Sequence, residues 1–369
     1  MQVLVVNAGS QTLKLRLLGG GDEVLHDALV PPDDADALDR FLASIRGDGM
    51  AIDAVGHRVV HGGIRFRAPV RVDADVEAAL ADLVDLAPLH QPGSLAGIRA
   101  VRAALPGIPA VACFDTAFHA TLPAAAATYA LPAEWRDRWP LRRFGFHGLS
   151  HARAVRRAPE VAGLVGRVDP AAVRVVSCHL GGGASLCAAR GGVSIDTTMG
   201  FTPLEGLVMA TRSGSVDPGL VLWLTTTGGL GPEEVTDGLE TRAGLRGLAG
   251  SSDMRDVLAA RARGEPDAVL AFDVYCHRLA QELAAMTASA GGVDVVVFTG
   301  GVGEHAPDVR AATAERLGFL GLAVDDARNR VGAGDRDISA EGATARCVVI
   351  EAREDLEIAA QTRRVLSAA

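Results

Sequence analysis

The 369 residues form an acidic, aliphatic chain with a formal charge of −9 and an isoelectric point near 5.6. Hydrophobic residues make up 49% and aromatic residues 4%, which predicts a core of Val, Leu, Ala and Ile and excludes a disordered chain. The negative charge argues against a general nucleic-acid or anionic-membrane partner, although a local cluster of Arg and His could still bind an anion. The length suits two domains or one large α/β domain.

The cysteines and the N-terminal sequence indicate the cellular compartment of the protein. No C-x-x-C pair occurs, so the cysteines are expected to be buried small hydrophobes in a reducing compartment. They are Cys113, Cys178, Cys187, Cys276 and Cys347. The N-terminus lacks a basic segment followed by an apolar one, and no run of about 20 apolar residues occurs. The sequence therefore predicts a cytoplasmic protein.

Strands and helices are expected to alternate along the chain. Runs rich in β-branched or other apolar residues occur at 3–6, 110–114, 173–177, 293–299 and 345–350. Between two of them, Phe272, Cys276, Leu279, Leu283 and Met286 follow a spacing of four and three, which predicts one buried helix face that ends at the glycine pair 291–292. This alternation is typical of α/β layers.

Two similar hairpins are predicted, at "VLVVNAGSQTLKLRLL" and at "VRVVSCHLGGGASLCAARGGVSI". Each runs from an apolar strand through a turn of small residues into a second strand, which suggests an internal duplication with the two turns facing each other across a cleft. Turns of Gly, Ser and Thr offer backbone N–H groups to phosphate oxygens. A third glycine loop, "FTGGVGEH", favours nucleotide binding over two ordinary hairpins.

Arginine, histidine and aspartate gather in short segments at strand ends or in loops. They include His57, Arg58 and His61; His90; Asp115 and His119; His147 and His151, placed in a loop; His179; and Arg212 and Asp217. No zinc spacing, Walker A motif, G-x-G-x-x-G or G-x-S-x-G occurs. What remains is an anion site of arginines and imidazoles beside glycine loops, as phosphoryl transfer requires. His57, His61, His119 and His151 are expected to hold loops together.

Ten segments occur in the order found in the acetokinase family. They are "VLVVNAGSQTLK", "GHRVVHGG", "APLHQP", "FDTAFH", "GFHGLSH", "HLGGGAS", "GFTPLEGLVMATRSGSVDPG", "SSDMRD", "FTGGVGEH" and "EAREDLEIA". The chain thus resembles that family over essentially its whole length. The resemblance implies the duplicated actin-like ATPase (ribonuclease H-like) α/β fold, with two domains of mixed sheets flanked by helices around a central cleft. Residues 1–118 and 356–369 would form a carboxylate and phosphate domain closed by the C-terminal helix, and 119–355 a nucleotide-binding domain.

The implied activity is the reversible, ATP-dependent phosphorylation of acetate to acetyl phosphate by direct in-line transfer. Mg²⁺, with Mn²⁺ as a substitute, and ATP or ADP are the implied cofactor and co-substrates, and the implied assembly is a homodimer without nucleic-acid or membrane partners. Arg58 and Arg212 would bind the carboxylate and the phosphoryl group. His147 would donate to the phosphoryl oxygens, with His90 and His179 nearby, and Asp115 would orient an arginine or the metal shell.

The resemblance also assigns the remaining site residues. The methyl pocket would comprise Val60, Leu89, Phe146 and Pro203, and the metal would be held by Asn7 and Glu354. The nucleotide and its phosphates would be bound by Ser10, Thr12, Lys14, His179, Gly181, Gly182, Gly183, Asp253, Met254, Arg255, Gly300, Gly301, Val302, Gly303 and Glu304. Because Val60 leaves little room, acetate is favoured over longer acids.

Three alternatives stay open at this point. An enlarged pocket would favour propionate or another short-chain acid. Departures from the family pattern at Gln11, Gly182 and His305 leave open a phosphoryl donor other than ATP. A catalytically silent ATP-binding switch is a third possibility, but it would not need the two substrate arginines.

Overall fold

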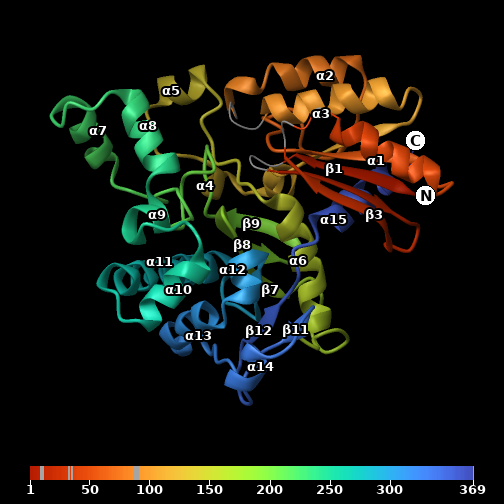
Figure 1. Cartoon of the computed structure of the whole chain (residues 1–369). Coiled ribbons are helices and arrows are strands. Elements are labelled where there is room, and N and C mark those ends of the chain that lie inside the picture. The colour runs from red at the N-terminus through yellow and green to blue at the C-terminus, as the bar shows by residue number, and fades with distance from the viewer. Residues whose placement is uncertain (9–11, 32–33, 35, 87–90, 369) are drawn as a thin grey trace. The chain divides into compact units, whose positions relative to one another are not determined.

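The computed structural model describes residues 1–8, 12–31, 34, 36–86 and 91–368 (Figure 1). The chain divides into two compact units. Unit 1 comprises Met1–Ala120, Phe146–Arg153 and Arg353–Ala369, and unit 2 comprises Thr121–Gly145 and Ala154–Ala352. These bounds differ from the predicted division because residues 119–120, 146–153 and 353–355 cluster with unit 1. The reason is long-range contact, for example from the amide of Gly148 to the carbonyl of Asp115.

Unit 1 is built on a mixed sheet in the order β3-β2-β1-β4-β6-β5. Its strands are β1 (Val3–Ala8), β2 (Leu13–Leu18), β3 (Val24–Val30), β4 (Ala54–Val59), β5 (Val70–Arg71) and β6 (Ala110–Phe114). Its helices are α1 (Ala37–Gly47), α2 (Ala74–Ala81), η1 (Val84–Leu86), α3 (Gln91–Ala104), η2 (Ala117–Thr121, which ends one residue into unit 2) and α15 (Glu354–Ser367). α6 (Gly148–Val161) begins in unit 1 and ends in unit 2.

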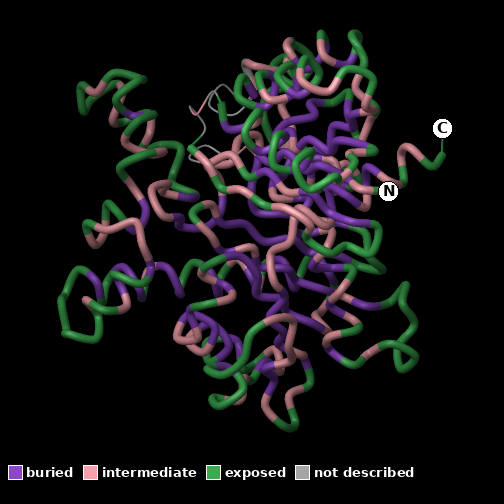
Figure 2. The backbone as a smooth tube through the Cα atoms, turned by 45° about the vertical axis from the view of Figure 1, so that its right-hand side comes forward, coloured by how far each residue is buried: buried purple, intermediate pink, exposed green. Residues whose placement is uncertain are grey.

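Alternation along the strands of unit 1 separates two apolar layers. Leu4 and Val6 point to one face, where they pack with Phe41 and Leu42 of α1. Val3 and Val5 point to the other face, which α15 covers, as expected for the C-terminal helix. The buried residues therefore follow the strands and the inner sides of these helices (Figure 2).

Unit 2 repeats the same sheet in the order β9-β8-β7-β10-β12-β11. Its strands are β7 (Arg174–Leu180), β8 (Ala184–Arg190), β9 (Val193–Thr197), β10 (Val295–Thr299), β11 (Arg336–Asp337) and β12 (Arg346–Val349). Its helices are α4 (Ala124–Ala127), α5 (Ala133–Arg138), α7 (Pro218–Thr226), α8 (Pro232–Thr241), α9 (Gly244–Ala249), α10 (Met254–Ala262), α11 (Pro266–Ala290), α12 (Gly300–His305), α13 (Pro307–Arg316), η3 (Gly318–Leu320) and α14 (Asp326–Arg330).

The two sheets confirm the predicted duplication. In unit 1 an antiparallel hairpin β1–β2 is followed by the parallel strands β4 and β6 and an antiparallel β5. In unit 2 the hairpin β7–β8 is followed in the same way by β10, β12 and β11. Each hairpin provides the first two strands of its sheet, as the alternating sequences predict. Residues 9–11, at the first turn, lie outside the described part of the chain.

The predicted buried helix is confirmed as α11, whose apolar stripe packs on β7, β8 and β9. It ends at Gly291, which takes the left-handed φ of 70° that glycine adopts without strain. Two local predictions were wrong. The segment after β10 forms the short helix α12 rather than a loop, and His151 lies inside α6 rather than in a loop.

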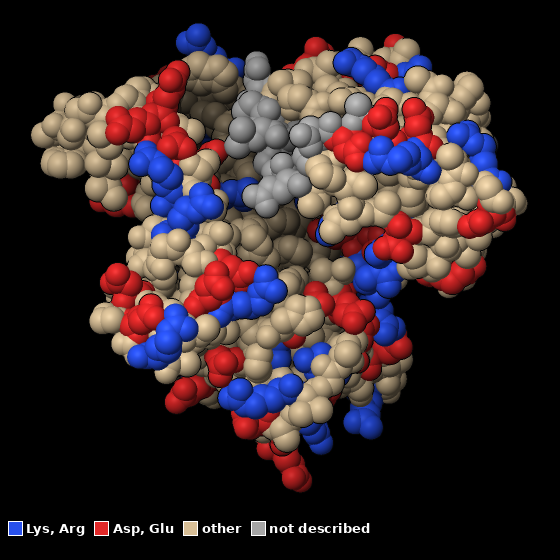
Figure 3. All heavy atoms as spheres, viewed as in Figure 1, with Lys and Arg blue, Asp and Glu red and all other residues tan. Residues whose placement is uncertain are grey.

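The five cysteines are buried free thiols, as predicted. Within the described residues, the structure contains no helix with the length and apolarity that a membrane span needs. On the face shown in Figure 3, positive and negative side chains are interspersed.

Candidate functional site

Three neighbouring strands of unit 1 carry a polar residue at or just beyond their carboxyl ends, on the face covered by α15. These residues are Asn7 on β1, Arg58 on β4 and Asp115 directly after β6. Earlier residues on that face include Val3, Val5, Val111 and Cys113, which pack against α15, and Gly56, where an added Cβ would meet Ile358 and Thr362. Because β1, β4 and β6 are parallel neighbours, their carboxyl ends meet at one edge of the sheet. The polar residues therefore converge just beyond the apolar layer.

Arg58 is locked by Asp115 in a two-pronged ion pair. Its Nε donates to Asp115 Oδ1 at 3.0 Å and its Nη2 to Oδ2 at 2.6 Å. The Asp115 side chain is 1% exposed and that of Arg58 is 16% exposed. Burial alone would lower the pKa of Arg58, but the carboxylates of Asp115 and Glu354 outweigh it and raise that pKa above its usual value. Arg58 is therefore a permanently charged, oriented guanidinium.

Asn7 and Glu354, the predicted metal ligands, lie beside this ion pair. Asn7 Nδ2 donates to Glu354 Oε2 at 3.0 Å, and Arg58 Nη1 donates to Asn7 Oδ1 at 3.1 Å. Glu354 Oε2 also lies 3.7 Å from Arg58 Nη1. Glu354 is the first residue of α15, so the return of the C-terminal helix to the sheet brings it to the strand edge.

His147 belongs to unit 1 as well, where the backbone next to it packs tightly against Asp115. Its φ of 56° is left-handed, which is uncommon for a residue other than glycine. The next residue, Gly148, donates its amide to the carbonyl of Asp115 at 2.8 Å, and a Cβ at Gly148 would lie 2.1 Å from that oxygen. Only glycine permits this approach. This contact therefore ties the backbone that carries His147 to the residue that holds Arg58.

The predicted pocket residues of unit 1 are buried where the structure describes them. Val60 is 5% and Phe146 is 1% exposed. A ring nitrogen of His119 lies 3.1 Å from the carbonyl of Phe146, so this buried histidine contacts the backbone of a predicted pocket residue. His57 and His61 are buried as well. Ser10, Leu89 and His90 lie outside the described residues.

Thr12 and Lys14 lie on the first hairpin, with Lys14 exposed and opposite Asn7 in the strand register.

In unit 2 the predicted phosphate glycines surround the carboxyl ends of β7 and β10. The Gly181 amide donates to the carbonyl of Gly183 at 2.9 Å and closes the hairpin turn. Gly300 has a φ of 78°, and a Cβ there would lie 2.8 Å from the carbonyl of Leu180. A Cβ at Gly303 would contact Phe298. His179, Gly182, Gly301 and Val302 belong to the same two segments. The glycines thus give both segments a close backbone approach, as a phosphate cradle requires.

The segment that carries Arg212 contacts the turn between β7 and β8. The amide of Ala210 donates to the carbonyl of Gly182 at 3.1 Å. Arg212 Nη1 donates to the carbonyl of Pro203 at 3.3 Å, which places two predicted site residues together. Burial lowers the pKa of Arg212, and within the described residues no carboxylate lies at ion-pair distance from it. Arg212 Nη1 also lies 3.7 Å from Met209 Sδ.

The other predicted nucleotide residues are engaged within unit 2. Glu304 Oε1 accepts from the amides of Gly300 and Ala352 at 3.0 and 2.9 Å, so its carboxylate closes α12 and holds the segment after β12. Asp253 caps α10 and pairs with Arg255 at 2.5 Å, while Met254 is 4% exposed. The Arg255 side chain is 87% exposed.

Sequence reasoning missed the residues that hold the start of α15. Arg16 of β2 and Arg353 both bind Asp355, the residue after Glu354. The only signal in the sequence was the adjacency of Arg353, Glu354 and Asp355, because nothing local pairs Arg16 with a residue 339 positions away.

Comparison with known proteins identifies the family. Residues 31–360 match the model of the acetokinase family. The chain is also 45% identical to an acetate kinase of Leifsonia xyli subsp. xyli over 397 aligned residues, which cover 99% of both sequences. The chain belongs to the acetokinase family.

Solved structures of this family share the fold. An acetate kinase of Porphyromonas gingivalis and a propionate kinase of Francisella tularensis subsp. tularensis each match with a TM-score of 0.90 and 34% identity over 99% of both chains. A ROK hexokinase of Thermus thermophilus, 14% identical with a TM-score of 0.50, shares the fold alone. The predicted duplicated actin-like kinase fold is therefore confirmed.

Proposed function

We propose that this chain transfers a phosphoryl group reversibly between ATP and acetate. Its family, and the acetate kinases to which it is similar over full length, support this proposal. The observation that carries it is the buried Arg58–Asp115 pair beside Glu354, because a charged guanidinium held rigidly at a sheet edge is suited to an anionic acceptor. A protein that only binds a nucleotide would not need it.

Each charged group then has a role in transfer. Arg58 and Arg212 bind the carboxylate and the phosphoryl group and offset the negative charge that develops between them. A carboxylate oxygen attacks the γ-phosphorus, the bond from this phosphorus to the bridging oxygen breaks, and ADP leaves with the electron pair. His147 donates to oxygens of the phosphoryl group in flight. The glycines of the β7–β8 turn and of α12 contact the nucleotide and its phosphates.

The donors at Glu354 and Asn7 fit Mg²⁺. Mg²⁺ prefers oxygen ligands and is usually held by one or two carboxylates together with water and phosphate oxygens. The carboxylate of Glu354 and the amide of Asn7 are neighbours, and no cluster of three or more His, Cys, Asp or Glu among the described residues forms an all-protein cage. When bound, Mg²⁺ or Mn²⁺ would neutralise charge on the nucleotide phosphates.

Val60 and Phe146 limit the length of the acid. Both are closely packed, so an added methylene would have to displace buried side chains. One methylene changes specificity by about 10- to 200-fold in such pockets, so we expect acetate to be preferred and propionate to react more slowly. The similarity to a propionate kinase makes propionate the second candidate.

The test is acyl-phosphate formation with ATP and Mg²⁺ from formate, acetate, propionate and butyrate, trapped with hydroxylamine. We expect the largest kcat/KM with acetate. A maximum at propionate would keep the reaction and contradict the pocket argument. Product with pyrophosphate but not with ATP would reassign the donor, and no product with any acid and either donor would contradict the proposed function.

We also propose that the protein is a cytoplasmic homodimer. The five buried thiols suit a reducing compartment. The resemblance to the family supports a dimer, and α7 exposes Leu220, Leu222 and Trp223, side chains of the kind that a second copy would cover. Sedimentation equilibrium at micromolar concentration would contradict the dimer if it gave a mass of 38.1 kDa.

A further inference from the structure

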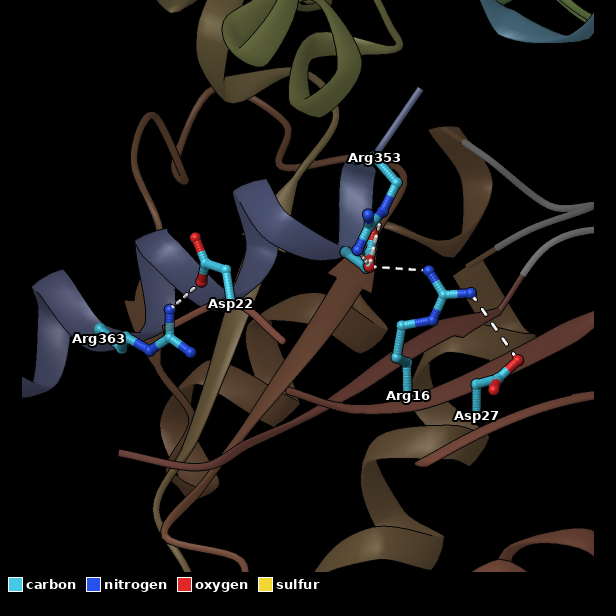
Figure 4. Close-up of polar contacts among 6 residues, drawn as sticks. Arg16, Asp22, Asp27, Arg353 and Arg363 are labelled. Carbon is cyan, nitrogen blue, oxygen red and sulfur yellow. Dashed lines mark hydrogen bonds and ion pairs between the residues drawn. The ribbon is translucent and has the colours of Figure 1, made fainter. Parts of the chain in front are cut away.

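The start of α15 is fastened to the sheet by side chains on both sides of Glu354. Arg16 Nη1 lies 2.9 Å from Asp355 Oδ2, and Arg353 binds the same carboxylate through Nε at 3.0 Å and Nη2 at 2.8 Å. Arg16 Nη2 also lies 3.9 Å from Asp27 on β3. Figure 4 shows Arg16 projecting from its strand between Arg353 and Asp27. Asp355 therefore joins the helix start to β2.

This fastening replaces an ordinary helix cap. Arg353, at the N-cap position of α15, makes no capping side-chain hydrogen bond. The first turn contains Glu354, Asp355 and Glu357, whose charges suit the helix N-terminus but repel one another. A cation from outside the helix offsets that repulsion. Arg16 supplies this cation from β2. It therefore both offsets the charge of the first turn and holds that turn against the sheet.

The position of Arg16 relates it to the candidate site. Arg16 is paired with Val5 in the β1–β2 register, two residues before Asn7 on β1. Asn7 contacts Glu354, and Asp355 contacts Arg16. At the start of α15, Glu354 is thus bound to β1 and its neighbour Asp355 to β2, the two strands of one hairpin. The Asp355 side chain is 13% exposed and that of Arg16 33%, so solvent screens this contact less than an open surface pair.

A second ion pair farther along the helix provides an internal comparison. Arg363 Nη1 lies 2.5 Å from Asp22 Oδ1, and its Nη2 lies 2.5 Å from the carbonyl of Gly19 (Figure 4). This pair also attaches α15 to unit 1. It lies nine residues after Glu354, about 13 Å along a helix that rises 1.5 Å per residue.

We infer that Arg16 is a positioning residue that holds Glu354, through Asp355 and the first turn of α15, where the carboxylate can act as a metal ligand. The inference rests on the proposed function and deepens it. Partners that orient a metal ligand typically change metal affinity or activity by about 10- to 100-fold when they are removed. Arg16 does not touch substrate in this role.

The test compares Arg16→Gln, Arg16→Lys and the control Arg363→Gln. The first readout is hydrogen exchange of the amides in the first turn of α15. The second is the Mn²⁺ dissociation constant in the presence of ADP, measured by calorimetry. The third is steady-state kinetics, which shows whether each variant changes the KM for Mg²⁺·ATP or kcat. We expect Arg16→Gln to speed exchange in the first turn and weaken Mn²⁺ binding by about 10-fold, with partial recovery in Arg16→Lys.

Arg363→Gln should speed exchange only in the last turns of α15 and leave Mn²⁺ affinity unchanged. Equal effects of the two Gln variants on Mn²⁺ affinity would show a general role in helix docking and overturn the inference. Unchanged exchange and affinity in Arg16→Gln would overturn it as well. If the wild-type protein formed no acyl phosphate, the proposed function would fail, while the exchange and Mn²⁺ measurements would still decide the role of Arg16.

Discussion

At the scale of single residues, the Arg58–Asp115 pair combines a structural role with a proposed chemical one. Both side chains are largely removed from solvent, so each compensates a charge that would otherwise be unfavourable inside unit 1. The pair alone does not make a site, because a well-matched buried ion pair is also found in purely structural settings. Its position beside Asn7 and Glu354 at the strand ends is what makes it part of the proposed site.

Replacing Arg58 alone should be more damaging to stability than replacing both partners. Arg58→Ala leaves the carboxylate of Asp115 buried without its cation, and we expect a loss of about 3 kcal/mol in the free energy of unfolding. The double variant Arg58→Ala, Asp115→Asn should recover more than half of this loss. Both should lack acyl-phosphate formation, since both lack the guanidinium. Urea unfolding provides the measurement, and equal stability of the single and double variants would contradict the coupling.

At the scale of elements, the seating of α15 on the sheet decides where Glu354 lies. The helix passes directly over Gly56 of β4, where a Cβ would lie 2.5 Å from Thr362 Oγ1 and 2.6 Å from Ile358 Cγ2. An added Cβ therefore requires the side chains of Thr362 and Ile358 on α15 to move. A strand glycine is thus required by packing rather than by backbone conformation.

Gly56→Ala should therefore lift α15 and lower both stability and activity. We expect a loss of about 1–3 kcal/mol from overpacking, together with a higher KM for Mg²⁺·ATP. The control is Gly97→Ala in α3, where the nearest atom would be 3.8 Å from the new Cβ. Because alanine is the better helix former, Gly97→Ala should leave stability equal or raise it by up to about 1 kcal/mol. Thermal unfolding of both variants is the measurement. Equal losses of stability in Gly56→Ala and Gly97→Ala would contradict the packing argument.

At the scale of the whole molecule, buried histidines are unevenly distributed. Burial lowers the pKa of His57, His61 and His119 to about 4, with the carbonyl of Phe146 opposing the shift at His119. These three and the buried His151 all lie in unit 1. In contrast, Trp135, Trp139 and Trp223 all lie in unit 2, so tryptophan fluorescence monitors unit 2 alone. The two units can therefore be followed separately during acidification.

We expect acid to destabilise unit 1 before unit 2. Above pH 7 these histidines are neutral in both the folded and the unfolded chain and contribute no pH dependence. As pH falls below about 6.5 the unfolded chain binds protons that the folded chain excludes, so stability falls until about pH 4, by about 3 kcal/mol for each histidine. The protection of unit 1 amides, relative to their intrinsic exchange rate at each pH, should fall between pH 7 and 5 while tryptophan fluorescence stays constant.

A variant isolates the histidine contribution. His57→Leu should reduce the pH dependence that these three histidines give unit 1 by about one third, because one of the three is gone. His277→Gln, on the exposed side of α11 in unit 2, is the control. Simultaneous loss of both units at one pH, or an unchanged slope in His57→Leu, would show that other groups control acid unfolding.

The sequence by itself determined the local elements and the family. Alternation and turn residues predict both hairpins, and the spacing of Phe272, Cys276 and Leu279 predicts α11, because these patterns depend on neighbours within a few residues. The order of ten motifs identified the family, and the resemblance predicts Arg58, Asp115 and Glu354 as site residues. The confirmed fold follows from the same resemblance and from the repeated sheet order.

Only the tertiary structure decided how distant residues meet. Asn7 reaches Glu354 across 347 positions because β1, β4 and β6 are parallel and α15 returns to their sheet. The same return pairs Arg16 with Asp355. Glu304 accepts from the backbone amides of Gly300 and Ala352 in its own unit because the glycine segment folds into the helix α12. Such contacts depend on long-range strand pairing and helix packing, which no periodicity in the sequence encodes.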